Sequence, residues 1–141
     1  MDELLAYARS FVGVPYVWGG EHPMDGYDCG GFVQEVLASA GEDKLGDQTA
    51  QGIYDHLIET GTPGAMGAGV IAFFGKSVMK ITHVAFCVDG YRMLEAGGGG
   101  SRTLTREDAI RDHAMVRERL IKNRRDLVAT IKPQYNKIGL I

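Results

Sequence analysis

The spacing of hydrophobic residues divides the chain into a helical first part and a strand-forming second part, with the change near residue 60. In the first part, apolar side chains recur every three or four positions, which is the period of an amphipathic helix. This pattern predicts helices over residues 2–12, 29–40 and 50–59. Asp28 and Thr49 directly precede the second and third helices, where an N-cap residue is expected.

The second part of the chain reads as short strands joined by glycine-containing turns. Strands are expected over residues 70–74, 83–88, 91–96, 115–121 and 126–131. A short helix is expected to begin at residue 105, where the sequence has a capping-box pattern. Helices followed by strands favour an α+β fold, with the N-terminal helices packed on a central antiparallel sheet. The length of 141 residues fits a single domain over residues 1–141.

The connection near residue 89 decides which side chains share a face of the sheet. We predict a three-residue loop over residues 88–90, with Gly90 in the left-handed conformation that such loops need at their last position. This loop pairs His83 with Glu95 on one face of the hairpin. A two-residue turn would shift the register by one residue and move Glu95 to the opposite face.

Composition and charge limit the functions that this chain can have. The net charge is −3, which gives no indication of nucleic-acid binding. The charge is uneven, however, because residues 1–101 carry −8 and residues 102–141 carry +5. This basic C-terminal segment has two interpretations. It completes the sheet and pairs with the acidic body of the same fold, or it docks an acidic partner.

Two further sequence features bear on location. No apolar run reaches the roughly 18–20 residues of a membrane-spanning helix, so no membrane span is expected. The first five residues are acidic and apolar and lack the basic start of a signal peptide. We therefore expect synthesis in the cytoplasm without an export signal.

Cys29 is the candidate nucleophile, because it begins a predicted helix directly after a loop. Unpaired N–H groups and the helix dipole at that position favour the thiolate, which is the reactive form of cysteine. The neighbouring carboxylate of Asp28 acts in the opposite direction. Cys87 lies within an apolar strand and is interpreted as a buried hydrophobic residue.

A cysteine nucleophile needs a base, and the base needs a group that orients it. His83 opens an apolar strand whose end can face a helix N-terminus, and Glu95 is the polar residue expected beside it. The other histidines are His22, His56 and His113, of which the last two are expected to be solvated. A metal site is a weaker interpretation of the loop before Cys29. Its ligands would be His22, Asp25, Asp28 and Cys29.

Two ordered motifs and two strands carry a resemblance to a known family. The first motif is Pro15-Tyr16-Val17-Trp18-Gly19-Gly20, and the second is Asp28-Cys29-Gly30-Gly31-Phe32. They resemble the P-Y-x-W-G-G and D-C-S-G-F motifs of the NlpC/P60 cysteine peptidases. Residues 68–74 and 82–86 resemble the strands that follow in that family, the second of which contains its catalytic histidine.

The resemblance implies a papain-like fold and hydrolysis of peptide bonds in the stem peptides of peptidoglycan. The bond is commonly the one between D-glutamate and diaminopimelate or lysine. Cys29 would be the nucleophile, His83 the general base and Glu95 the orienting residue. Substrate contacts are expected from Tyr16, Trp18, Asp28 and Gly30. No metal or organic cofactor is implied.

The sequence departs from the family pattern at two positions of the expected site. Gly30 stands where serine is usual, so one hydroxyl contact is missing. Glu95 stands where histidine, asparagine or glutamine is usual. A carboxylate can orient an imidazole and stabilise its charged form, so a Cys-His-Glu mechanism is expected.

Residues 93–99 most resemble the small single-domain members of the family that phages and prophages encode. We therefore expect an association with phage tail or virion proteins through the basic C-terminal segment. Two alternatives stay open. The protein could be a structural tail component with vestigial or conditional activity, or a papain-like amidase or acyltransferase that acts on another substrate.

Overall fold

A computed structural model of the chain describes residues 1–22, 26–41, 49–100 and 102–135. Its main element is a six-stranded antiparallel sheet with the strand order β3-β8-β4-β5-β6-β7. The strands of this sheet are β3 (Thr62–Pro63), β4 (Ile71–Gly75), β5 (Ile81–Cys87), β6 (Arg92–Gly97), β7 (Met115–Leu120) and β8 (Leu127–Lys132). The remaining elements are α1 (Asp2–Arg9), β1 (Glu21–His22), β2 (Gly26–Tyr27), α2 (Cys29–Ser39), α3 (Ala50–Leu57), α4 (Arg106–Asp112) and the 3-10 turn η1 (Ile121–Asn123).

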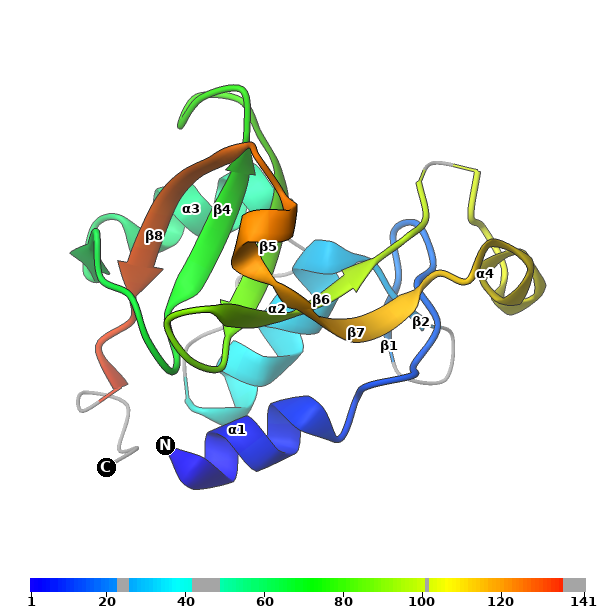
Figure 1. The fold of residues 1–141 in the computed structure, drawn as a ribbon, viewed down its shortest axis with the longest axis horizontal. Helices are drawn as coiled ribbons and strands as arrows, with labels where there is room; N and C mark the ends of the chain where they lie inside the picture. Colours follow the sequence, from blue (N-terminus) through cyan, green and yellow to red (C-terminus); the bar gives the residue numbers. More distant parts are fainter. Residues whose placement is uncertain (23–25, 42–48, 101, 136–141) are drawn as a thin grey trace.

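The N-terminal helices pack against one face of this sheet, so the predicted α+β class is confirmed (Figure 1). The predicted caps are confirmed as well. The Asp28 carboxylate accepts a hydrogen bond of 2.7 Å from the N–H of Gly31, and the Thr49 hydroxyl accepts one of 3.0 Å from Gly52. These bonds satisfy backbone donors that the first turn of a helix leaves unpaired.

The first helix is shorter than its hydrophobic pattern predicts. It ends at Arg9 rather than near residue 12, and Phe11 is buried from the turn that follows. The chain leaves the helix because the N–H of Gly13 donates to the carbonyl of Val116, 2.8 Å away. Gly13 has a φ of +96°, which only glycine adopts without strain.

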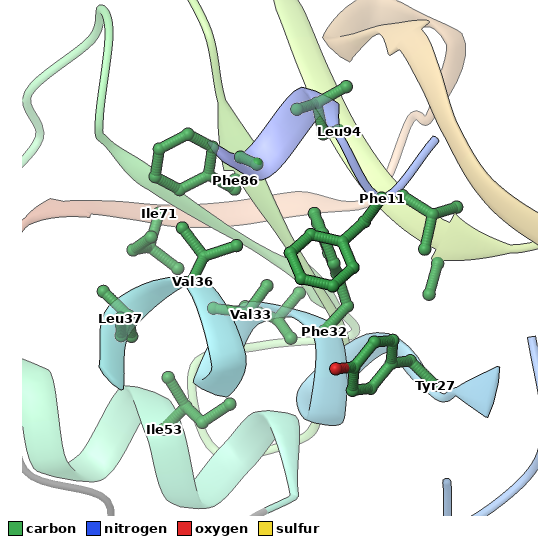
Figure 2. Close-up of a cluster of buried hydrophobic side chains, with 14 of the residues drawn as sticks. Phe11, Tyr27, Phe32, Val33, Val36, Leu37, Ile53, Ile71, Phe86 and Leu94 are labelled. Carbon is green, nitrogen blue, oxygen red and sulfur yellow. The ribbon is translucent and has the colours of Figure 1, made fainter. Parts of the chain in front are cut away.

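The main hydrophobic core lies between the helices and the sheet (Figure 2). The side chains of Phe32, Val33 and Val36 on α2 lie in one buried cluster with Ile71 and Phe86 of the sheet. These five residues are almost fully buried, which gives α2 its fixed position over β4 and β5. The start of α2 is therefore held in place by the packing of the rest of the helix.

The opposite face of the sheet is also buried. Alternate residues of β4 and β5, including Phe74 and Cys87, point to this side together with Met93 of β6. Ile121 in η1 covers them, so the segment between β7 and β8 crosses over this face. Because both faces are covered, β4 is apolar along its whole length rather than alternating.

The hairpin between β5 and β6 differs from the prediction in its loop residues. Cys87 pairs with Met93, and the N–H of Val88 donates to the carbonyl of Arg92. The turn therefore spans Asp89-Gly90-Tyr91 instead of residues 88–90. Gly90 is not left-handed, because the turn is held by the Asp89 carboxylate, which accepts hydrogen bonds of 2.8 and 2.7 Å from the N–H groups of Tyr91 and Arg92.

The corrected register moves each pair by two positions and so leaves the parity unchanged. His83 is no longer expected directly opposite Glu95. Both side chains nevertheless point to the face that Cys87 and Met93 share, because side chains alternate along a strand.

The basic C-terminal segment supplies β7 at one edge of the sheet and β8 next to β3 at the other. Between β6 and β7, α4 begins at the predicted capping box, in which the side chains of Thr105 and Asp108 each accept a backbone hydrogen bond. Two ion pairs, from Arg117 and Arg119 to Glu95, join this segment to the acidic body of the fold.

Replacing Asp89 with alanine removes the acceptor of two backbone hydrogen bonds in the turn. We expect the free energy of unfolding to fall by about 1 kcal/mol, measured by chemical denaturation. Asp89→Asn keeps an acceptor oxygen and should lose clearly less. Equal losses in the two variants would contradict the role given to this side chain.

Candidate active site

A cleft of about 350 Å³ lies at the N-terminus of α2. The structure brings all seven residues expected at the site to its lining, which includes Tyr16, Trp18, Asp28, Cys29, Gly30, His83 and Glu95. Four other polar or charged residues line the cleft without having been expected there, namely Thr49, Thr82, Arg117 and Arg124.

The strands that flank Cys29 separate at the cleft. Within the described parts of β5 and β6, the pairs are Phe86 with Leu94 and Cys87 with Met93, so pairing stops before the cleft-facing half of β5. The backbone N–H of Val84 hydrogen bonds to the Cys29 thiol instead. Cys29, the first residue of α2, thus accepts a hydrogen bond from a backbone N–H that a longer β5–β6 pairing could use.

Burial dominates the acidity of Cys29. It raises the pKa of the thiol to about 11, and the negative charge of Asp28 acts in the same direction. The N–H groups of Val84 and Gly30 and the charge of Arg124 lower the pKa, but by less. The helix N-terminus was expected to favour the thiolate, and this structure shows that desolvation outweighs it. The thiol is therefore the resting form.

His83 and Glu95 form a buried hydrogen-bonded pair. Nε2 of His83 lies 2.7 Å from Oε1 of Glu95, and the two residues are 8% and 0% exposed. A carboxylate accepts hydrogen bonds, so Nε2 carries the proton and Nδ1 is the nitrogen that can accept one. The ring of Phe74 supports the imidazole, with ring centroids 5.6 Å apart.

Two arginines of β7 hold the second oxygen of Glu95. Nε of Arg117 and Nη1 of Arg119 donate to Oε2 at 3.2 and 3.0 Å. Burial alone would raise the pKa of Glu95, but the hydrogen bond and charge of His83, together with Arg119, lower it to about 2. Glu95 is therefore ionised at neutral pH.

Sequence reasoning missed this pair of arginines, although a signal was present. Arg117 and Arg119 stand two residues apart in a predicted strand, so they point to the same face. The register places Glu95 opposite Arg117 and Met93 opposite Arg119. Only the pairing of β6 with β7, which local sequence does not specify, reveals that both cations meet Glu95.

Two aromatic residues of the first motif line the cleft in different ways. Tyr16 is buried, and burial, followed by the charges of Cys29 and Asp28, raises its pKa to about 12. Its hydroxyl is therefore protonated and can donate a hydrogen bond near the thiol. Trp18 is 54% exposed at the rim, so much of its indole ring is available to a ligand.

Two glycines at the end of β6, Gly97 and Gly99, pack closely against residues of the cleft. A Cβ at Gly99 would lie 2.5 Å from Cδ1 of Tyr16 and 2.8 Å from Oγ1 of Thr103. A Cβ at Gly97 would lie 3.0 Å from Oε2 of Glu95. The glycine run over residues 97–100 therefore begins with the last residue of β6, and its first and third residues pack against the site residues.

The described residues contain no group of three or more histidine, cysteine or acidic side chains arranged to hold a metal ion. Asp25, one ligand of the weaker metal hypothesis, lies outside the residues that the structure describes. In the same part of the chain, no helix has both the length and the apolar character needed to cross a membrane.

The fold and the cleft with its cysteine and histidine define a class of protein, which similarity to known proteins identifies. The profile of the NlpC/P60 family matches residues 13–125. The chain belongs to the NlpC/P60 family and has its α+β fold.

Two curated relatives come from Bacillus subtilis. The chain is 34% identical over 101 residues to the bifunctional muramidase/DL-endopeptidase CwlT, covering 70% of this chain and 30% of that protein. It is 32% identical over 101 residues to a gamma-D-glutamyl-L-lysine dipeptidyl-peptidase, covering 67% of this chain and 31% of the relative. The chain thus spans less than a third of the length of these two relatives.

Solved structures agree on the fold. The NlpC/P60 domain of the peptidoglycan hydrolase SagA aligns with a TM-score of 0.68 and 23% identity, covering 92% of this chain and 95% of that one. The peptidoglycan hydrolase RipB of Mycobacterium tuberculosis aligns with a TM-score of 0.67 and 20% identity, covering 93% and 62%.

The glycine run offers a matched pair of variants. Gly99→Ala should force Tyr16 or Thr103 to move, and overpacking of this kind costs about 1–3 kcal/mol. Gly100→Ala meets nothing within 4 Å and should leave stability within about 0.5 kcal/mol of the parent. Thermal or chemical unfolding of both variants makes the comparison. Similar stabilities of the two variants would show that the close contact of Gly99 with Tyr16 and Thr103 is not required.

The low pKa of Glu95 predicts how its contribution depends on pH. The pKa is about 2 in the folded protein against an ordinary value of 4.5. Ionised Glu95 therefore stabilises the fold fully above pH 4.5, and this stabilisation is lost as the pH falls toward 2. Glu95→Gln should lower the free energy of unfolding by about 3 kcal/mol at pH 7, because it breaks a buried charged network.

Unfolding measured between pH 7 and pH 2.5 provides the test. The difference between the parent and Glu95→Gln should shrink across the acid range. A difference that stays constant down to pH 2.5 would contradict an ionised Glu95.

Proposed function

We propose that the domain is a thiol peptidase that cuts peptide bonds in peptidoglycan stem peptides. The observation that carries this proposal is a thiol at the start of a helix, in one cleft with a buried His83–Glu95 pair. Cys29 is the nucleophile, His83 the general base and Glu95 the residue that orients the base. A cleft with these three groups has the parts that acyl transfer through a covalent intermediate requires.

The first step is attack of the Cys29 sulfur on the carbonyl carbon of the scissile amide. The resting thiol has to lose its proton, and Nδ1 of His83 accepts it while Nε2 stays bonded to Glu95. The imidazolium that forms is stabilised by the adjacent carboxylate. The carbonyl oxygen becomes negative, and the N–H of Cys29, which has no partner within the helix, helps to stabilise it.

The second step breaks the carbon–nitrogen bond. His83 returns its proton to the leaving amine, which departs and leaves a thioester on Cys29. Water then attacks the thioester with His83 again acting as base, releasing the acid product and the free thiol. Tyr16, protonated and next to the thiol, donates a hydrogen bond to the bound peptide.

The names of the relatives support a proposal for the type of bond that this chain cuts. Of the two B. subtilis relatives described above, one is a DL-endopeptidase and the other acts on a gamma-D-glutamyl-L-lysine linkage. We propose that this chain cuts a γ-glutamyl amide of the same kind. Asp28 provides a negative charge in the cleft for an amine of the peptide. Trp18 and Gly30 also line the cleft and form part of the space for the peptide.

Location on a phage tail or virion stays a prediction. It was inferred from the resemblance of residues 93–99 and from the basic C-terminal segment. In that segment Arg117 and Arg119 are both engaged with Glu95, so their charges serve the domain itself. Co-sedimentation of the full chain with purified particles would support the prediction. Deleting residues 117–141 would remove β7 and β8 and is not a usable test.

Replacing Cys29 with alanine should lower the rate of stem-peptide hydrolysis by at least about a thousandfold, because the covalent step is lost. The measurement is product release from a purified stem peptide. Cys87→Ala is the matched control, since Cys87 is buried in the second core away from the cleft and should retain activity once folded. Equal activity in Cys29→Ala and the parent would end the proposal.

The substrate can be separated from the chemistry by a protection experiment. A thiol reagent should label Cys29 in the free protein, and a stem peptide should slow that labelling. Slower labelling without hydrolysis would favour the amidase or acyltransferase alternative, because it would show binding at the nucleophile without cleavage of this bond.

A further inference from the structure

Arg124 lines the cleft but has no part in the catalytic steps above. It follows η1, in the segment that crosses the second face of the sheet. Its guanidinium is fixed on two sides. Asp126 accepts hydrogen bonds from Nε at 3.0 Å and from Nη2 at 2.8 Å, and the ring centroid of Phe74 lies 5.0 Å from Cζ.

This arrangement is more rigid than a surface arginine usually is. A bidentate carboxylate and an aromatic face together set the plane of the guanidinium before any ligand arrives. Phe74 also contacts the imidazole of His83, so Arg124 and the proposed base share one aromatic support. A charge held in this way is positioned relative to the reacting centre rather than free to follow solvent.

The two arginines of the cleft differ in how their charge is used. Arg117 is bound to Glu95, which is 0% exposed, so its charge compensates a carboxylate that solvent cannot reach. Arg124 is bound to Asp126, whose side chain is 41% exposed. Water therefore partly screens the charge of this carboxylate. Among the described residues, the bonds of Arg124 use Nε and Nη2, and the Nη1 edge is available for a second carboxylate.

A negatively charged substrate needs such a group here. Asp28 and Glu95 line the cleft and would repel an anion, while Arg124 would attract it. A γ-glutamyl amide carries an anion by its own chemistry, because linkage through the side-chain carboxyl leaves the α-carboxylate free. That carboxylate is on the residue that supplies the acyl group, so it enters the cleft with the scissile bond.

We propose that Arg124 binds a free carboxylate on the residue that supplies the scissile carbonyl, and so makes the cleft selective for anionic over amidated substrates. This inference rests on the proposed function for the position of the scissile bond. It adds a specificity-determining residue that takes no part in proton transfer. Asp126 and Phe74 are positioning residues for Arg124.

The test uses two peptides that differ only in having a free carboxylate or a carboxamide at this position. For the parent protein, kcat/KM should be higher for the carboxylate peptide. Arg124→Gln should lower kcat/KM for that peptide by about 10- to 100-fold, mainly through KM, and change the carboxamide peptide by less than about threefold. Arg125→Gln, an exposed neighbour absent from the cleft lining, is the matched control and should keep the preference.

An equal loss on both peptides would overturn the inference, since it would give Arg124 a general structural or oxyanion-stabilising role. Retention of the full preference in Arg124→Gln would overturn it as well. Binding of both peptides to Cys29→Ala protein, measured by calorimetry, separates this inference from the proposed function. A carboxylate preference that Arg124→Gln removes would support the inference even if the parent protein hydrolysed neither peptide, and equal affinities of the two peptides would overturn it.

Discussion

Glu95 is a carboxylate that solvent does not reach, and the arrangement of three strands depends on how its charge is accommodated. An ion of this kind costs several kcal/mol to bury, and the cost is offset only if all its lone pairs find donors. His83 from β5 serves one oxygen, and Arg117 and Arg119 from β7 serve the other. Loss of β7 would leave a buried anion with the imidazole as its one remaining hydrogen-bond partner among these four groups.

This network joins the two differently charged parts of the chain. The acidic body contains a carboxylate at its centre, and the basic C-terminal segment returns along the edge of the sheet to neutralise it. The position at which histidine, asparagine or glutamine was expected from the family motif can therefore hold an ionised glutamate. The pairing between β6 and β7 thus brings two arginines of the basic segment to the glutamate that departs from the family motif.

Much of the fold was predictable because it depends on local patterns. The caps at Asp28 and Thr49, the apolar stripe of α2 and the alternation that puts His83 and Glu95 on one face all follow from residues close in sequence. The turn at Asp89 was assigned one residue too early, because its side-chain hydrogen bonds replaced the left-handed glycine that was expected. The arginines around Glu95 and the position of Arg124 depend on contacts between residues more than 20 positions apart in the sequence. A single sequence does not specify which strands pair or in which register.

The burial of the Cys29 thiol has a consequence for the chemical durability of the protein. Peroxides and other oxidants react with the thiolate, and oxidation beyond the sulfenic acid is not reversed outside specialised systems. Because desolvation raises the pKa of this thiol to about 11, the thiol form predominates at pH 7. Burial of the thiol thus limits its reaction with oxidants, because it keeps the reactive thiolate a minor form.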